Sequence, residues 1–346
     1  MQLAPIARGS MLGVAAAVLF GITTPLITHF GRGVGPFATA TLLYGGAALG
    51  AGLPLRSSAP SLGRAQLGRL AAVALFGAAL APASLAWGLQ HTGALSASLL
   101  LNLEAVFTVF LARAIHREPI GGRVALAVGL MVAGGVILAF RTTGAGASSA
   151  LGMAAILGAS CGWALDNTLT RPLADFDPRA VVFGKALLGA TLSAAMALLL
   201  RDPWPPLFAA AGILACGATG YGLSLRLYLG AQRILGAART GSLFAFAPFV
   251  GAALAFALGD RQSALLVASA SVLFGVAVYL HVTEAHAHRH RHEPIEHEHA
   301  HRHDDGHHDH VHDPPVAAEH SHMHRHGSIE HEHEHGSDLH HRHAHD

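Results

Sequence analysis

Long apolar runs recur throughout residues 1–283, and each is close to the length of a membrane-spanning helix. A helix needs about 20 mostly apolar residues to cross the hydrocarbon core of a bilayer. We predict ten spans, at residues 11–30, 36–53, 67–88, 93–111, 122–140, 150–170, 180–200, 207–229, 241–259 and 263–282. This part of the chain is therefore expected to be an all-α membrane protein, because an ordinary soluble domain carries far more charge.

Charge divides the chain into two parts of different composition. Residues 1–283, called the body, carry 17 basic and 7 acidic side chains, a net charge of +10. Residues 284–346, called the tail, carry 5 basic and 14 acidic side chains, a net charge of −9, and 23 of the 27 histidines. The whole-chain charge of +1 hides this contrast. We expect the lipid bilayer as a partner of the body and no nucleic acid.

The arginines predict the orientation of the spans. If the N-terminus is inside, twelve arginines fall in inner segments and only Arg32, Arg141, Arg201 and Arg261 fall in outer loops. Short cytoplasmic segments carry an excess of Lys and Arg. We therefore expect both termini, and hence the tail, in the cytoplasm, with the body in a bacterial-type inner (plasma) membrane.

The body also contains an internal repeat. Residues 88–90 (GLQ) resemble residues 230–232 (GAQ), and Arg117-Glu118 corresponds to Gly259-Asp260. We assign residues 1–141 to a first five-helix repeat, 142–283 to a second, and 284–346 to the tail. Two copies of a unit with an odd number of spans lie in opposite orientations, which is a transporter architecture with its site between the halves.

Three motifs carry a resemblance to a known family. They are residues 99–108 (LLLNLEAVFT), 161–167 (CGWALDN) and 241–249 (GSLFAFAPF). The chain resembles the EamA-type transporters of the drug/metabolite transporter superfamily over about residues 10–282. The resemblance implies two five-helix repeats and a central cavity lined by spans one, three, four, six, eight and nine. The tail departs from the ordinary family pattern.

Polar residues inside the spans are the candidates for substrate binding. Glu104 lies near the middle of the fourth span, where a carboxylate in contact with lipid is costly, so it is expected to face protein or water. It is either a substrate or proton site or a structural carboxylate. Polar and aromatic side chains of spans three, four, six and eight complete the predicted set: Trp87, Asn102, Trp163, Asp166, Asn167, Tyr221 and Ser224.

Several of these residues allow a second interpretation. Asp166 is near the inner end of its span and could simply pair with Arg171. Lys185, the only lysine, either extends its ammonium group to the headgroups, pairs with Asp166 or Glu104, or is a counter-charge for an anionic substrate. Pro248 removes a backbone donor within the ninth span and frees a carbonyl group one turn earlier. The glycines, including Gly129, Gly134, Gly135 and Gly275, are read as close-packing positions.

Histidines alternate with acidic residues in the tail, which predicts transition-metal binding. The predicted ligands for zinc, nickel or cobalt are His297, His299, His301, His303, His331, His333 and His335. The tail has too few apolar residues to fold alone, so we expect it to be disordered. A solvated, pH-responsive tail without metal is the alternative.

These features favour a secondary transporter that exports small metabolites or amphipathic compounds, with a metal-binding regulatory tail and no required cofactor. Two alternatives stay open. One is an exporter of divalent zinc, nickel or cobalt that uses the tail as sensor or collector. The other is a membrane-anchored metal storage or sensing protein. No convincing catalytic constellation appears in the spans, so an enzyme is not expected. The sequence leaves the substrate, the coupling ion and the oligomeric state open.

Overall fold

The computed structural model describes residues 3–52, 63–116, 120–139, 149–173, 176–235, 237–260, 264–282, 286–291, 295–301, 320–326 and 330–335. Helices occupy each of the ten ranges predicted to be spans. The first five ranges contain α1 (Leu3–Gly21) with α2 (Thr23–Phe30), α3 (Pro36–Ala51), α4 (Arg64–Val73) with η1 (Ala74–Leu80) and α5 (Ala81–His91), α6 (Ala94–Leu100) with α7 (Leu103–Leu111) and η2 (Ala112–His116), and α8 (Gly122–Ala139). The elements η1 and η2 are π-helical.

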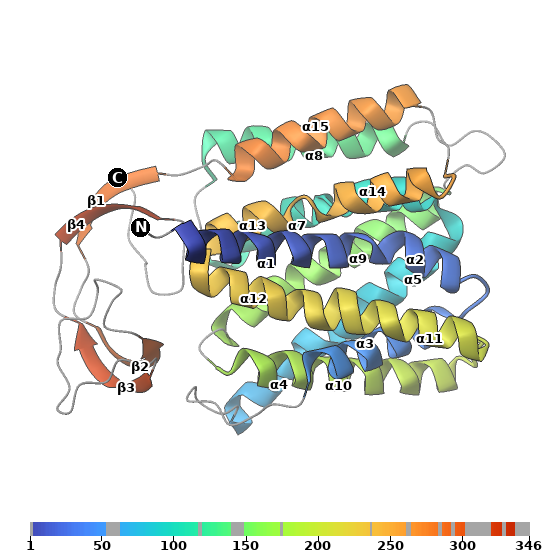
Figure 1. Ribbon diagram of the computed structural model, residues 1–346, viewed down its shortest axis with the longest axis horizontal. Helices are drawn as coiled ribbons and strands as arrows, with labels where there is room; N and C mark the ends of the chain where they lie inside the picture. Colours follow the sequence, from blue (N-terminus) through green and yellow to red (C-terminus); the bar gives the residue numbers. More distant parts are fainter. Residues whose placement is uncertain are drawn as a thin grey trace.

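The second five ranges follow the same order. They contain α9 (Ala150–Thr170) with the short 3₁₀ helix η3 (Arg171–Leu173), α10 (Pro178–Leu199), α11 (Leu207–Cys216) with the π-helix η4 (Gly217–Leu223) and α12 (Ser224–Leu235), α13 (Ala237–Phe244) with α14 (Ala247–Ala257), and α15 (Ala264–Val282). The helices run roughly parallel or antiparallel to one another in a single bundle (Figure 1).

Length and composition allow five helical stretches of the described chain to cross a membrane individually. They are Ala7–Phe30, Arg64–His91, Ala94–Ile115, Arg179–Leu199 and Leu207–Gln232. Large apolar side chains also cover the outside of the bundle, such as Leu207 and Phe208, which are 87% and 79% exposed. A surface of this kind is stable against lipid and unfavourable in water. The body is therefore an integral membrane protein.

Glycine and proline begin and interrupt these helices. Pro36 and Pro178 occupy the first helical positions of α3 and α10, where no backbone N–H is needed. Asp177 caps α10, and its carboxylate accepts a hydrogen bond of 2.9 Å from the N–H of Arg179. The helical path is interrupted at Ala245–Phe246, directly before Pro248. Pro248 therefore lies in the first turn of α14, where its missing backbone N–H is not needed.

The tail contains four short strands, so the expectation of an entirely disordered tail is corrected for the described residues. Strand β1 (His286–Arg291) pairs with β4 (Glu330–His335), and β2 (Ile295–His301) pairs with β3 (His320–His326), both antiparallel. A strand repeats every two residues, and the alternation of histidine with other residues has the same period. The described tail is thus held as two antiparallel backbone ladders.

Candidate functional site in the centre of the bundle

An ion pair lies inside the bundle between two neighbouring helices. The ammonium group of Lys185 on α10 contacts the carboxylate of Asp166 on α9, and the two side chains are only 15% and 6% exposed. The hydroxyl of Thr170 donates to the other carboxylate oxygen over 3.1 Å. Charges this far from water are stable only when paired. The partner of Asp166 is therefore Lys185, and the interpretation of Lys185 as a group that extends to the headgroups is wrong.

Asp166 also lies directly against the backbone of η1. A Cβ atom on Gly77 would stand 2.3 Å from the Cγ atom of Asp166, so only glycine allows this approach. The carbonyl oxygen of Gly77 accepts two side-chain hydrogen bonds, 2.6 Å from the hydroxyl of Tyr44 and 3.0 Å from Nε1 of Trp163. This junction joins α3, η1 and α9. Gly77 and Tyr44 are not among the residues predicted from the sequence, although a tyrosine in an apolar span is a usable signal.

A second carboxylate stands beside the ion pair. Asn167 on α9 donates a hydrogen bond of 2.7 Å from Nδ2 to Oε1 of Glu104 on α7. Glu104 is half-buried and Asn167 is exposed, so the carboxylate faces an accessible side of α9. Asp166 and Asn167 are consecutive, and one turn of α9 thus presents a buried charge to α10 and an amide to α7.

Aromatic rings surround one side of this polar cluster. The ring of Phe20 on α1 lies 5.4 Å from Tyr221 on η4 and 6.4 Å from Trp163, measured between centroids. Tyr221 also lies 5.6 Å from Tyr44. Edge-to-face arrangements at these distances are favourable, and they keep large side chains in fixed positions. We call these residues, together with Glu104, Asp166, Asn167 and Lys185, the central cluster.

Three predicted binding residues make other contacts. Asn102 is buried and donates from Nδ2 to the carbonyl oxygen of Leu99 over 3.0 Å, at the interruption between α6 and α7. The hydroxyl of Ser224 donates over 2.8 Å to the carbonyl oxygen of Ala16, which joins α12 to α1. Trp87 stacks on His91 with their centroids 4.1 Å apart. These groups serve helix packing and helix ends in this structure.

The metal ligands predicted from the sequence lie only in the tail. Among the described residues of helices α1–α15, no group of three or more His, Cys, Asp and Glu side chains is placed to hold a metal ion. Of the predicted tail ligands, His297, His299 and His301 lie on β2, and His331, His333 and His335 lie on β4. His303 lies outside the described residues.

Chemically, the central cluster offers an accessible carboxylate, a buried ion pair and aromatic faces. Such a set can bind a polar or amphipathic small molecule, with the carboxylate recognising a hydrogen-bond donor or a positive charge and the rings covering an apolar part.

Known proteins resemble parts of this sequence and its fold. Residues 7–140 match the EamA-like transporter family. An uncharacterized transporter from Methanothermobacter thermautotrophicus is 27% identical over 215 residues, which cover 60% of this chain and 62% of that protein, less than two thirds of its length. A protein of known crystal structure shares the fold with a TM-score of 0.57 at 20% sequence identity, over 79% of this chain and 97% of that chain. Residues 7–140 are thus similar to the EamA-like transporter family, the family that the sequence motifs resemble.

Proposed function

We propose that this protein is a secondary transporter that exports small metabolites or amphipathic compounds by alternating access. The observation that carries this proposal is the central cluster itself. An ion pair and a hydrogen-bonded carboxylate, Glu104, meet inside an apolar bundle. Charged groups inside membrane proteins are costly and usually mark a substrate or ion path.

Interrupted helices next to the cluster support the same proposal. The path between α6 and α7 is interrupted at Leu101–Asn102, and the path between α13 and α14 at Ala245–Phe246. The π-helices η1 and η4 lie within the third and eighth predicted spans. Discontinuous helices expose backbone groups that are tolerated where they line a cavity, and transporters place substrates there.

The packing of the helices supports two related halves, residues 1–141 and 142–283. Helix α1 of the first span packs on α12 of the eighth, and α5 of the third span packs on α9 of the sixth. The first and sixth spans are equivalent, as are the third and eighth, so each of these contacts becomes the other when the two halves are exchanged. Equivalent spans also pack on each other, α3 on α10 and α8 on α15. An arrangement that is unchanged when the halves are exchanged is what a pseudo-two-fold axis produces. We propose that the halves are inverted repeats that rock around the central cluster.

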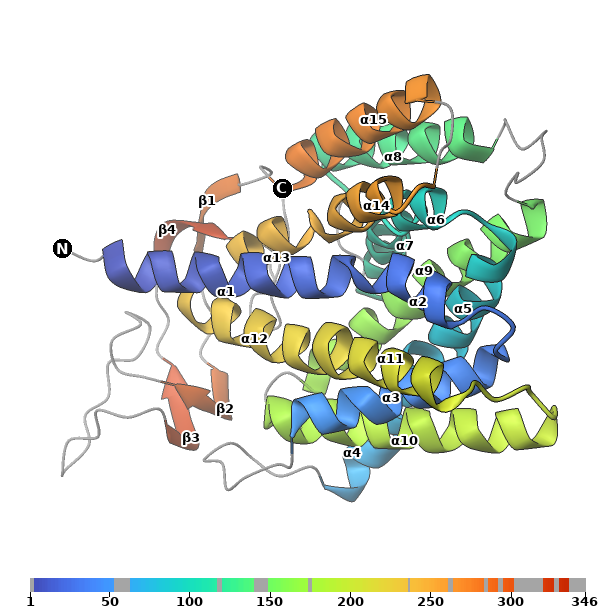
Figure 2. The same ribbon diagram turned by 45° about the vertical axis from the view of Figure 1, so that its right-hand side comes forward.

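The bundle has distinct ends, which supports the proposed orientation. The first residues of α1 and the last turn of α15 lie at one end, and the connection between α2 and α3 lies at the other (Figures 1 and 2). Termini at the same end agree with an even number of crossings, and we propose ten. The arginine bias assigns the end that carries the termini to the cytoplasm.

We further propose that the tail binds zinc, nickel or cobalt and regulates transport. The strand register supports this, because it places histidine opposite histidine six times: His286 with His335, His288 with His333, His290 with His331, His297 with His324, His299 with His322, and His301 with His320. Directly opposed residues of antiparallel strands have Cβ atoms about 4.5–5.5 Å apart. Histidine is a common zinc ligand, so we propose that the paired strands supply histidines to shared ions.

A ligand screen followed by a transport assay tests the proposal. Thermal unfolding of the purified protein is measured with amino acids, nucleobases, organic cations and zinc, and the strongest stabiliser is used for counterflow into proteoliposomes. We expect an organic compound to be transported by wild-type protein and not by Glu104→Gln, which retains a hydrogen-bonding side chain at the same position. Zinc flux without organic flux would support the metal-exporter alternative, and zinc binding without any flux would support storage or sensing.

A further inference from the structure

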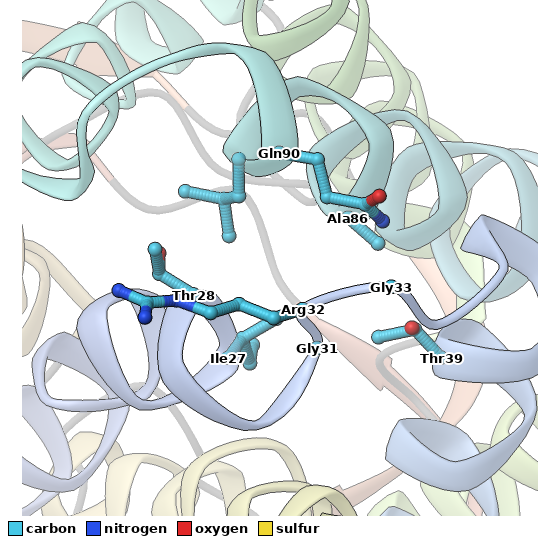
Figure 3. A pocket seen from close by; sticks show the side chains of 9 residues that line it. Ile27, Thr28, Gly31, Arg32, Gly33, Thr39, Ala86 and Gln90 are labelled. Carbon is cyan, nitrogen blue, oxygen red and sulfur yellow. The ribbon is translucent and has the colours of Figure 1, made fainter. Parts of the chain in front are cut away.

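A second site is built at the end of the bundle opposite the first residues of α1 and the last turn of α15. A cavity of about 350 Å³ lies between α2, α3 and α5 and contains none of the predicted binding residues (Figure 3). Its floor is apolar, formed by Ile27, Ala86 and Leu89, which are 1%, 3% and 4% exposed. Its rim is polar, and among the described residues that line it Arg32 alone is charged.

The guanidinium of Arg32 is available to a ligand. It extends back along α2 to lie beside Thr28 (Figure 3). Among the described residues it has no ion pair and no hydrogen bond. The carboxylate of Asp202, which lies against Gly35 near the cavity, accepts instead from the N–H groups of Phe37 and Ala38, over 2.7 and 3.2 Å. Asp202 is thus engaged at the start of α3.

The rim also positions other polar groups. Gln90 donates from Nε2 to the carbonyl oxygen of Val34 over 2.8 Å, which holds the connection between α2 and α3 against the end of α5. This contact fixes the cavity wall, and Gln90, which is exposed, lines the rim. An unpaired guanidinium above a buried apolar floor matches a ligand with one negative group and an apolar body.

We propose that this cavity is a binding site for amphipathic organic anions, which carry a carboxylate or phosphate on Arg32 and an apolar chain on Ile27 and Leu89. The site is separate from the central cluster, and its existence does not depend on which compound the transporter moves. Two sources have this chemistry, a free organic acid and the headgroup of an anionic lipid.

A series of acids tests the floor and the rim together. Calorimetric titration of detergent-purified protein with acetate, butanoate and hexanoate is expected to show affinity that rises about fourfold for each added methylene until the floor is covered. Arg32→Gln should weaken hexanoate binding by about tenfold or more. Arg201→Gln removes the same charge from the loop between α10 and α11, outside the cavity, and should change the affinity by less than about twofold.

Nanodiscs distinguish the two sources of ligand. If a lipid headgroup is the occupant, phosphatidylglycerol suppresses hexanoate binding and phosphatidylcholine permits it; if a free acid is the occupant, both lipids permit it. Both results support the site. Absence of hexanoate binding in detergent, affinity that does not change with chain length, or equal effects of Arg32→Gln and Arg201→Gln would overturn it. Because these titrations measure no transport, failure here leaves the role of the central cluster unaffected.

Discussion

The carboxylate of Asp166 meets a charged partner on one side and a backbone surface on the other, and the two contacts demand different residues. Lys185 balances the charge, whereas Gly77 provides the space. Removing one partner of a buried ion pair leaves an uncompensated charge, which is far more costly than removing both. The pair and the glycine can therefore be tested separately.

The ion pair predicts a strongly non-additive mutant cycle. Lys185→Gln or Asp166→Asn alone should lower the free energy of unfolding by about 3–5 kcal/mol, because one buried charge is left without a partner. The double variant should recover most of that loss, since it leaves two neutral amides that can bond to each other. Unfolding in detergent measures the cycle, and equal losses in both single variants and in the double variant would contradict it. Loss of transport in a stable double variant would assign the pair a functional role.

The close contact at Gly77 predicts that an alanine there is destabilising, and Gly68 in the same predicted span provides the control. Gly77→Ala places a methyl group 2.3 Å from Cγ of Asp166, so the Asp166 side chain or η1 must shift. We expect destabilisation of about 1–3 kcal/mol from overpacking, together with reduced transport. Gly68→Ala on α4 meets nothing within 4 Å and should be neutral or stabilising by up to about 1 kcal/mol. Thermal unfolding that ranks the two variants in the opposite order would remove the proposed close approach.

The site residues that could be predicted from the sequence are those whose side chains are unusual in an apolar membrane span. Glu104, Asp166 and Asn167 were selected because carboxylates and amides are rare in apolar spans, and the structure brings them together. Gly77 and Tyr44 were missed, because their importance arises only when distant segments meet. Ser224 and Trp87 have the same polar or aromatic character as residues of the cluster but contact other groups. One-dimensional spacing does not distinguish these cases.

Contacts between helices depend on glycines where α3 packs on α11 and η4. These glycines lie directly against the backbone of the neighbouring helix. A Cβ atom on Gly46 would lie 2.1 Å from the carbonyl oxygen of Leu214, and one on Gly50 would lie 2.1 Å from that of Ala218. Small residues four apart allow close approach of membrane helices. The predicted packing role was correct for Gly134 and Gly135, which face Phe274 and Leu103 at 3.2 and 2.9 Å. It was wrong for Gly129 and Gly275, which meet nothing within 4 Å.

Two adjacent glycines should therefore respond differently to the same substitution. Gly46→Ala directs a methyl group at the Leu214 carbonyl oxygen and should destabilise the fold by about 1–3 kcal/mol. Gly45→Ala meets only a Leu214 methyl at 3.9 Å, an ordinary contact, and gains helix propensity of up to about 1 kcal/mol. The pair is compared by unfolding in detergent, and a similar loss in both would refute the backbone contact between α3 and α11.

In the whole molecule, a tail of net charge −9 follows a body of net charge +10. The described arginines of the predicted inner segments, such as Arg8, Arg64 and Arg179, are exposed. A negative tail is attracted to such a surface, mainly at low ionic strength. Protonation of all 23 tail histidines would change the tail charge from −9 to +14 if the carboxylates stay ionised, and bound divalent ions act in the same direction. Metal or acid should therefore release the tail from the inner end of the body.

This electrostatic coupling predicts that metal binding and transport depend on the tail in different ways. Calorimetry of the full-length protein with zinc or nickel is expected to show several sites at pH 7.5. Binding should weaken steeply towards pH 5.5, because imidazole has an unperturbed pKa of about 6.5 and binds metal only when neutral. A chain that ends at Thr283 retains the four body histidines and serves as the control: it should lose these sites and still transport, but without a response to metal.

Persistent multi-site binding in the shortened chain would place the metal in the body. Complete loss of transport in a shortened chain that unfolds like wild type would make the tail part of the transport path, and would favour a divalent-metal exporter over an exporter of organic compounds.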